Sequence, residues 1–217
     1  MQEGLSFERK LTRRAAKHGL TMGKLGVHEI AVFHLGLGVQ DKDGFKRAVR
    51  ELSSEFVINS GFAGAVRTLL EPGDFVLAEN FSSPELANRL GTTRIFTAKG
   101  SFAPVNAVAD AAAKARFNSK GNIIALDMES AQVAALCSDL VVSYVSAKMI
   151  SDRYDERIPE IFLGKKIRKM KDISDAIWFA GRMLVLRQNL ADMLVELISV
   201  IGGPASREDK EIHFQKY

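Results

Sequence analysis

The chain has 217 residues, and we expect residues 1–217 to form a single domain that buries a core without disulfides or metals. Hydrophobic residues make up 47% and charged residues 26%, which are ordinary values for globular proteins. The net charge of +4 does not indicate a nucleic-acid partner. The one dense basic run, residues 165–171, is typical of a solvated surface segment, although a basic loop also attracts anionic ligands.

Cysteine usage and hydropathy bear on the cell compartment. The one cysteine, Cys137, has no internal disulfide partner, which fits a reducing compartment. No apolar stretch approaches the roughly 20 residues that a membrane span needs. The N-terminus runs into charged residues and shows no apolar signal core. We therefore expect a cytoplasmic protein with no membrane partner.

The first half of the chain alternates strand-like apolar runs with a helical pattern. Glycine, proline and aspartate mark its turns. The expected elements, in chain order, are a strand at 30–35, a helix at 43–54, a strand at 56–58 that breaks at Gly61 and Gly64, and, after a turn at 72–74, a strand at 75–78.

The second half continues the alternation. Pro104 is well placed to open an alanine-rich helix that runs to about Arg116. The remaining elements are a strand at 123–126, a helix at 129–137, a strand at 141–147 and a long amphipathic helix at 174–200. Strands that alternate with helices predict a three-layer α/β/α domain with a mixed, largely parallel central sheet.

Four segments follow strands of this predicted sheet: residues 36–38, 59–65, 127–131 and 148–152. Ligands of α/β sheets bind outside the carboxyl ends of the strands, so these segments are candidates for a site. The first two are rich in glycine, which permits close backbone approach to a ligand but is also routine in turns. Neither matches a dinucleotide or phosphate loop, so we expect no cofactor.

The other two segments carry carboxylates. Asp127 and Glu129 flank Met128 at a strand-to-helix junction, and Asp152 follows Ser151 after a second buried strand. Helix capping explains such residues as well as ligand binding does, because Asp and Ser side chains accept hydrogen bonds from the first backbone N–H groups of a helix. On the residues alone, both interpretations stay open.

Taken in order, these segments resemble the nucleoside phosphorylase family, and within it the methylthioadenosine/S-adenosylhomocysteine nucleosidase branch. The Met-Glu and Ser-Asp pairs, which a helix and a strand separate, are the most specific part of the resemblance. It extends over residues 36–152, and the matching pieces are Gly36-Leu37-Gly38, Ile58-Asn59-Ser60-Gly61-Phe62-Ala63-Gly64, Glu71-Pro72-Gly73-Asp74, Asp127-Met128-Glu129-Ser130 and Ile150-Ser151-Asp152.

The resemblance implies cleavage of the N-glycosidic bond of a purine nucleoside. Asp152, beside Ser151, matches the acid that protonates N7 of the purine, and an acid here resembles the enzymes that release adenine. Protonation helps because a purine anion is a poor leaving group. Glu129 matches the residue that binds the ribose hydroxyls and supports an oxocarbenium-like transition state. Met128 matches the apolar face beneath the sugar, and Phe102 matches the aromatic that stacks on the base.

The same resemblance bears on whether water or phosphate attacks the sugar. Phosphorylases of the family have arginine and serine around the glycine loop, where this chain has Asn59 and, after Gly61, Phe62. Asparagine resembles the nucleosidases, which use water and a glutamate near the N-terminus as general base, a role that Glu8 matches. Lys148 replaces an arginine that helps to hold the water, and it keeps the charge without the planar fork. Hydrolysis is favoured, with phosphorolysis as the alternative.

Three departures from the family pattern are visible. No apolar strand precedes Glu8, Phe62 stands where both branches have serine, and residues 74–102 form a shorter stretch than in the nucleosidases. That stretch normally helps to form the dimer interface and the pocket for the 5′ group. The substrate's 5′ substituent is therefore not readable, and a non-catalytic nucleoside binder is a further alternative. The resemblance also implies a homodimer.

The remaining conspicuous residues have simpler interpretations. His28 and His34 lie near one strand without a ligand set beside them, so we expect no metal site. Trp178, Phe179 and the methionines of the last helix are expected in the core or at a subunit interface. Cys137 is expected to be buried and inert.

Overall fold

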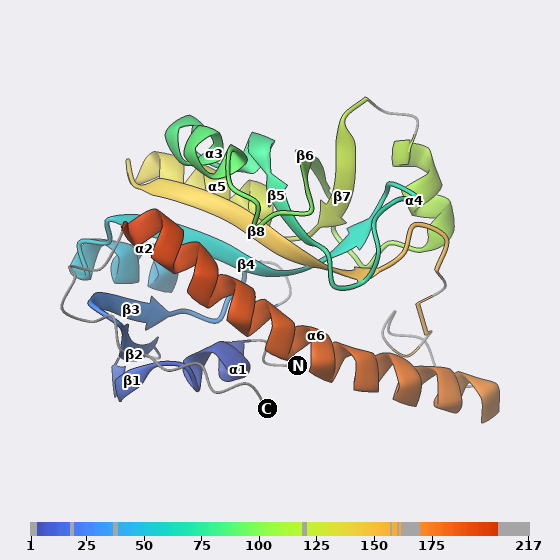
Figure 1. The fold of residues 1–217 in the computed structure, drawn as a ribbon, viewed down its shortest axis with the longest axis horizontal. Coiled ribbons are helices and arrows are strands. Elements are labelled where there is room, and N and C mark those ends of the chain that lie inside the picture. The colour runs from blue at the N-terminus through green and yellow to red at the C-terminus, as the bar shows by residue number, and fades with distance from the viewer. Residues whose placement is uncertain are drawn as a thin grey trace.

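A computed structural model describes residues 4–17, 20–36, 39–118, 121–156, 158–159, 161 and 170–203 (Figure 1). Leu37 and Gly38 of the first glycine segment lie outside the described residues, and so do residues 165–169 of the basic run. Within the described residues, no helix combines the length and the apolar character that crossing a membrane requires.

The N-terminal part is a small antiparallel sheet that follows a short helix. The helix α1 (Gly4–Glu8) leads into strands β1 (Thr12–Lys17), β2 (Leu20–Leu25) and β3 (His28–Val32), which pair in the order β1-β2-β3. The strand predicted at 30–35 is thus β3, but it ends at Val32 and pairs antiparallel with β2. The sequence did not indicate β1 and β2, because they are rich in basic and small residues and lack an apolar run.

The central sheet is mixed and closes on itself. Its strands are β4 (Phe56–Ala65), β5 (Phe75–Ala78), β6 (Ala98–Pro104), β7 (Ile123–Asp127) and β8 (Ser143–Asp152), and the closed order is β4-β7-β6-β5-β8. The pairs β4–β8, β5–β6 and β6–β7 are parallel, whereas β5–β8 and β4–β7 are antiparallel. The prediction of an α/β fold with a mixed, largely parallel sheet is confirmed; closure into a barrel was not expected.

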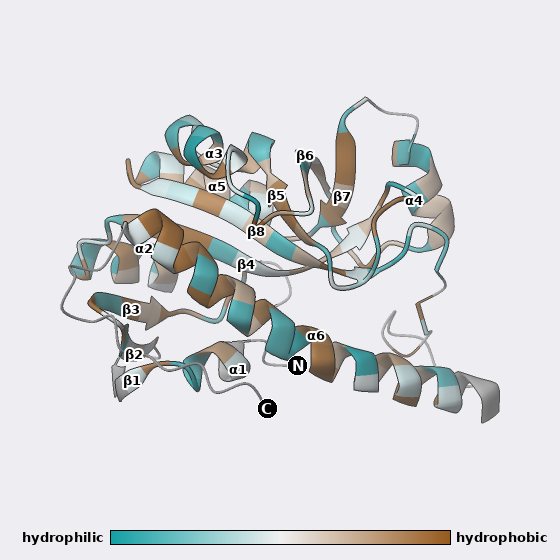
Figure 2. Cartoon of the chain, in the orientation of Figure 1, coloured by the Kyte–Doolittle hydropathy of each residue, from teal (hydrophilic) through white to brown (hydrophobic). Residues whose placement is uncertain are grey.

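Helices cover the barrel on its outside. They are α2 (Lys42–Glu51), the short 3₁₀ helix η1 (Glu79–Phe81), α3 (Pro84–Gly91), α4 (Ala111–Asn118), α5 (Ser130–Asp139) and α6 (Met170–Gly202). Figure 1 shows α6 running between the barrel and the N-terminal sheet, with α3 and α5 on the other side of the barrel. Figure 2 shows apolar colouring on β7 and hydrophilic colouring on much of α3.

The long helix α6 joins two parts of the core. One face packs Leu186, Leu190 and Leu197 against barrel residues such as Met149. Another face packs Ala191 and Ile198 against Phe7 and Leu11, next to α1. The apolar stripe predicted for this helix is therefore packed against the core. This packing holds the end of α1, where Glu8 lies, in place relative to β4 and β8.

Two predicted boundaries are wrong in ways that matter for the site. Strand β4 does not break at Gly61 or Gly64; it continues to Ala65, because it pairs with β8 from Phe56 to Gly64 and with β7 at Gly64 and Ala65. Gly61 adopts a φ of +144°, which glycine reaches without strain. Pro104 does not open a helix. It ends β6, where a missing N–H is tolerated, and α4 begins at Ala111.

Candidate active site

Strand β4 brings the two carboxylate segments together. On one side it pairs in parallel with β8, so that Asn59 lies opposite Ser146 and Gly61 opposite Lys148. Gly64 is the common neighbour of both segments, because it pairs with Asp152 of β8 and with Leu126 of β7, the residue before Asp127. A register shift between Ala63 and Gly64 places Asp152, and not Ser151, at that position. A single strand, β4, therefore separates the two segments. Neighbouring strands of a sheet lie about 4.8 Å apart.

The first group of polar residues surrounds the ammonium of Lys148, which is 1% exposed. Its Nζ lies 3.3 Å from Oδ1 of Asn59, 3.5 Å from Oδ2 of Asp127 and 3.6 Å from Oε2 of Glu129. The Asn59 amide group in turn donates to the hydroxyls of Ser130 and Ser146, both at 3.1 Å. We call these six residues the Lys148 cluster. It holds one formal positive charge and two negative ones.

Asp127 performs the capping role that the sequence left open. Its Oδ2 accepts from the backbone N–H of Ser130 at 3.0 Å and from the Ser130 hydroxyl at 2.5 Å, at the start of α5. Its other oxygen, Oδ1, is buried and has no hydrogen-bond partner among the described residues. Glu129 occupies the N-cap position but makes no side-chain cap bond, and its side chain is 15% exposed. Capping thus explains Asp127 and leaves Glu129 for another role.

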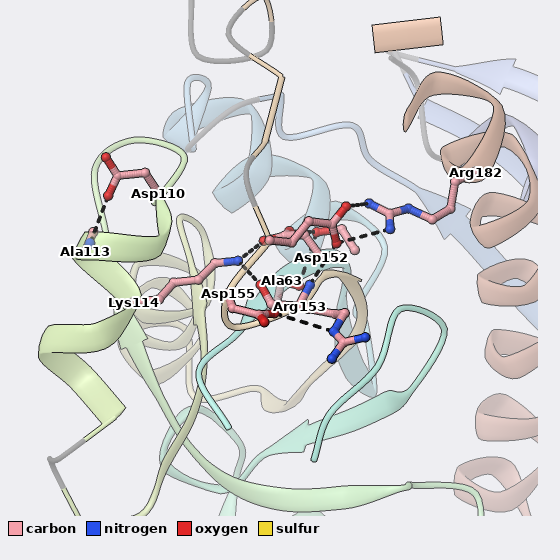
Figure 3. Close-up of polar contacts among 10 residues, drawn as sticks. Ala63, Asp110, Ala113, Lys114, Asp152, Arg153, Asp155 and Arg182 are labelled. Atoms are coloured by element: carbon pink, nitrogen blue, oxygen red, sulfur yellow. Dashed lines mark hydrogen bonds and ion pairs between the residues drawn. The ribbon is translucent and has the colours of Figure 1, made fainter. Parts of the chain in front are cut away.

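The second group is a buried ion pair at the end of β8 (Figure 3). Asp152 is 2% exposed, and its Oδ2 is bound by the ammonium of Lys114, a residue of α4 that is fully buried. Its Oδ1 accepts from the hydroxyl of Ser151, which also contacts the backbone oxygen of Ala63 at 3.2 Å. Lys114 donates to the backbone oxygen of Arg153 as well. Both oxygens of Asp152 are therefore engaged. We call Asp152 and Lys114 the Asp152 pair.

The loop after Asp152 is tied to α6. The backbone N–H of Arg153 donates to Glu156 at 3.1 Å, and Arg182 of α6 binds both carboxylate oxygens of Glu156. The Arg182 guanidinium also stacks on the rings of Trp178 and Phe179. Figure 3 shows this chain of contacts from α6 to the backbone beside Asp152. Bidentate Arg–carboxylate pairs are among the stronger and more directional contacts in proteins, so the loop has a defined geometry.

Glu8 lies at the end of α1, and helix α1 stands where the family pattern has a strand. The carboxylate is 9% exposed, and its Oε1 lies 2.8 Å from Nε2 of His34. His34 follows β3 and is about one-third exposed. His34 was not predicted to have a role, because a partner 26 residues away in the chain leaves no local pattern.

The other predicted ligand contacts have the following positions. Phe102 is 2% exposed and packs in the barrel core with Ala63, Ala125 and Ile150. Phe62 is partly buried and packs against the core beneath α6. Gly61 is buried in β4, and Met128 is partly buried between the two carboxylates of its segment. Base stacking by Phe102 and a place for Phe62 in the nucleophile pocket remain predictions.

Sequence reasoning missed two members of the site. Lys114 was counted only as part of an alanine-rich helix, although a lysine among Ala111, Ala112, Ala113 and Ala115 is the one charge on that stretch. Ser146 was hidden inside a predicted strand. Among the described residues, no three His, Cys, Asp or Glu side chains gather in a way that would hold a metal ion. Cys137 is buried as expected, and burial raises the pKa of its thiol to about 12.

The mixed α/β domain thus gathers buried carboxylates and two buried lysines on the two strands that flank β4 and on the helices next to them. A model of the phosphorylase superfamily matches residues 5–119, just over half of the chain, and the chain belongs to that superfamily. The predicted family is thus confirmed. The match ends before Asp127, so the roles of Glu129 and Asp152 do not follow from it. A comparison with curated protein sequences finds no match.

Solved structures share the fold at low sequence identity. An S-adenosylhomocysteine nucleosidase from Streptococcus pyogenes, in complex with 5-methylthiotubericidin, is 19% identical with a TM-score of 0.70, covering 91% of this chain and 92% of that one. The 5′-methylthioadenosine/S-adenosylhomocysteine nucleosidase of S. pneumoniae is 17% identical with a TM-score of 0.69, covering 92% and 95%. The futalosine hydrolase of Helicobacter pylori is 18% identical with a TM-score of 0.66, covering 91% and 93%.

Proposed function

We propose that the protein cleaves the N-glycosidic bond of a purine nucleoside, with an adenine nucleoside as substrate and water as nucleophile. The observation that carries the proposal is the placement of Glu129 and Asp152, which flank β4 in a chain of the phosphorylase superfamily. Similar folds include proteins described as nucleosidases and a futalosine hydrolase, which supports this class of reaction.

The proposed roles of the site residues follow from the chemistry of the N-glycosidic bond. Asp152 donates a proton to N7, so that the purine leaves as a neutral base and not as an anion. Glu129 accepts hydrogen bonds from the ribose hydroxyls and stabilises the positive charge that develops on the sugar. Met128, which directly precedes Glu129 in the chain, covers the apolar face of the sugar.

The charge of the Lys148 cluster supports water over phosphate. Lys148 is its only cation and already lies within 3.6 Å of two carboxylates, so a phosphate dianion would meet a net negative surrounding. Asn59 adds no charge. Water meets no such penalty, and Glu8, paired with His34, is the proposed base that activates it.

The decisive experiment measures free adenine. Adenosine, methylthioadenosine and other 5′-modified adenosines are incubated with the protein, with and without inorganic phosphate. We expect adenine and free sugar without phosphate. An absolute phosphate requirement would replace hydrolysis by phosphorolysis. Ligand-induced thermal stabilisation without turnover would identify a non-catalytic nucleoside binder and overturn the proposed activity.

We propose a homodimer, with α6 as the surface that supports it. Exposed apolar residues gather on this helix, and Ile177, Trp178, Leu184 and Val185 are between 59% and 68% exposed. Surface residues of this size in one stretch mark interaction sites. Light scattering of the purified protein tests the assembly, with Trp178→Glu as the disruptive variant. A wild-type mass of one chain at micromolar concentration would refute the dimer.

A further inference from the structure

Resting on the proposed function, we infer that Lys114 is a positioning residue for Asp152, and that Asp152 acts as one half of a buried ion pair and not as an isolated carboxylic acid. The first observation is burial. The Lys114 side chain is 0% exposed and that of Asp152 is 3% exposed, and the ammonium contacts Oδ2 directly. A lysine is almost never fully buried unless it is paired, so the contact explains why this lysine lies inside the protein.

The second observation is that the surrounding backbone is arranged around the pair. Helix α4 carries Lys114, and the Asp110 carboxylate caps its first turn by accepting from Ala113 at 2.8 Å. Gly64 of β4 lies against both partners: a Cβ at this position would stand 3.2 Å from Oδ2 of Asp152 and 3.2 Å from Cε of Lys114. Both partners would have to shift by a few tenths of an ångström to admit that Cβ, so glycine leaves the pair its room. Three separate elements, α4, β4 and β8, thus shape one contact.

The charges around the pair come from the loop after β8 and from α6. The Arg153 guanidinium is directed toward Glu71 and Asp155 at the surface, and only its backbone oxygen meets Lys114. Glu156 is neutralised by Arg182. Ser151, which holds the other oxygen of Asp152, carries no charge. Among these neighbours, Lys114 is therefore the cation that contacts the Asp152 carboxylate.

The pair acts on the reaction through the carboxylate that proton transfer leaves behind. When Asp152 gives its proton to N7, that carboxylate lies beside the Lys114 ammonium, which stabilises its negative charge. Lys114 also fixes which carboxylate oxygen faces the base.

The test compares kcat and KM of Lys114→Met and Lys114→Arg, with Arg116→Met as control, because Arg116 is an exposed residue of the same helix. For Lys114→Met we expect kcat to fall by about 10-fold to 100-fold, a fraction of what a general acid contributes. We expect KM to change much less, because Lys114 contacts Asp152 and not the substrate. Lys114→Arg should restore most of the wild-type kcat, and Arg116→Met should match the wild type throughout.

Folding is controlled with the double variant Lys114→Met/Asp152→Asn. If the pair is real, the double variant should melt at a higher temperature than Lys114→Met alone at pH 8, because no unpaired carboxylate remains. An unchanged kcat in a folded Lys114→Met protein would overturn the positioning role while leaving the proposed function intact. If Asp152→Asn alone keeps full activity, the proposed acid itself fails, and the two failures are thereby distinguished.

Discussion

The two buried lysines of the site are held in opposite ways. Lys114 contacts one carboxylate, that of Asp152, and the two charges balance. Lys148 lies between two carboxylates at 3.5 and 3.6 Å and an amide oxygen at 3.3 Å, distances too long for optimal hydrogen bonds. Lys114 thus makes two close contacts, with the Asp152 carboxylate and the backbone oxygen of Arg153, whereas Lys148 makes several longer ones.

This difference indicates different tasks. A tight pair fixes the orientation of one group, which suits the proton donor to the base. A loose cluster with an unsatisfied oxygen on Asp127 leaves polar groups ready to accept new partners, which suits the side where the sugar and the nucleophile would bind. Substitutions on the two sides should therefore have different signatures in activity and in stability.

The largest expected effect is that of Asp152→Asn on activity. The amide cannot supply the proton to N7, so kcat should fall about 10²-fold to 10⁴-fold. Glu129→Gln should reduce kcat less, since an amide oxygen still accepts from a ribose hydroxyl. Single-turnover release of adenine measures both variants, and circular dichroism confirms that each is folded. Equal effects of the two substitutions would remove the proposed division of roles.

The next effect is on stability and concerns Lys148→Met. Removing this cation leaves Asp127 and Glu129 buried or half-buried without their positive partner, and breaking a buried pair in this way typically costs about 3–5 kcal/mol. Urea unfolding of Lys148→Met beside Lys46→Met, an exposed lysine with a surface partner, gives the measurement and its control. A loss below about 1 kcal/mol, the range of surface pairs, would mean that the cluster does not depend on its cation.

Much of the fold was predictable because local patterns carry it. The strand at Phe75–Ala78 was predicted with the bounds that the structure shows, and the helix at Lys42–Glu51 nearly so. The closed sheet was not predictable, since closure depends on the antiparallel contact of β4 with β7, between residues far apart in the chain. The hairpin of β1 and β2 was not predicted either, because its sequence lacks the alternation of apolar and polar residues that indicates a strand.

For the site, sequence reasoning found the carboxylates but not their partners. Asp127, Glu129 and Asp152 stand in short motifs, whereas Lys114 lies 38 residues from Asp152 and His34 lies 26 residues from Glu8. A sequence motif consists of residues close together in the chain, whereas an ion pair between two elements joins residues that no local pattern connects. Asn59 and Lys148 were expected in loops after strands, but they lie within β4 and β8, because the barrel extends both strands.

A smaller effect is expected when a neutral member of the Lys148 cluster is removed. Ser130→Ala deletes a donor to Asp127 and an acceptor for Asn59, and net hydrogen bonds of this kind contribute about 1 kcal/mol each. Ser151→Ala, next to the Asp152 pair, removes the donor to Asp152. Its main effect should be on kcat, with only a small change in the free energy of unfolding. Parallel urea and kinetic measurements on both variants test this, and the reverse pattern would contradict the assignment of the two sides.

The smallest expected effect is on the local opening of α5, and the alkylation rate of the Cys137 thiol measures it. This residue lies in α5, whose first turn is held by Asp127 and Ser130, and burial raises the pKa of its thiol to about 12. Because the reactive form is the thiolate, alkylation of the folded protein should be negligible at pH 8 and should rise only as the pH approaches 12 or as α5 opens.

Lys148→Met should accelerate alkylation at pH 8, since it loosens the start of α5. Lys114→Met should not, because the Asp152 pair makes no contact with that turn. Equal acceleration in both variants would mean that the two groups open together, and the contrast between a rigid acid side and an adaptable sugar side would then fail.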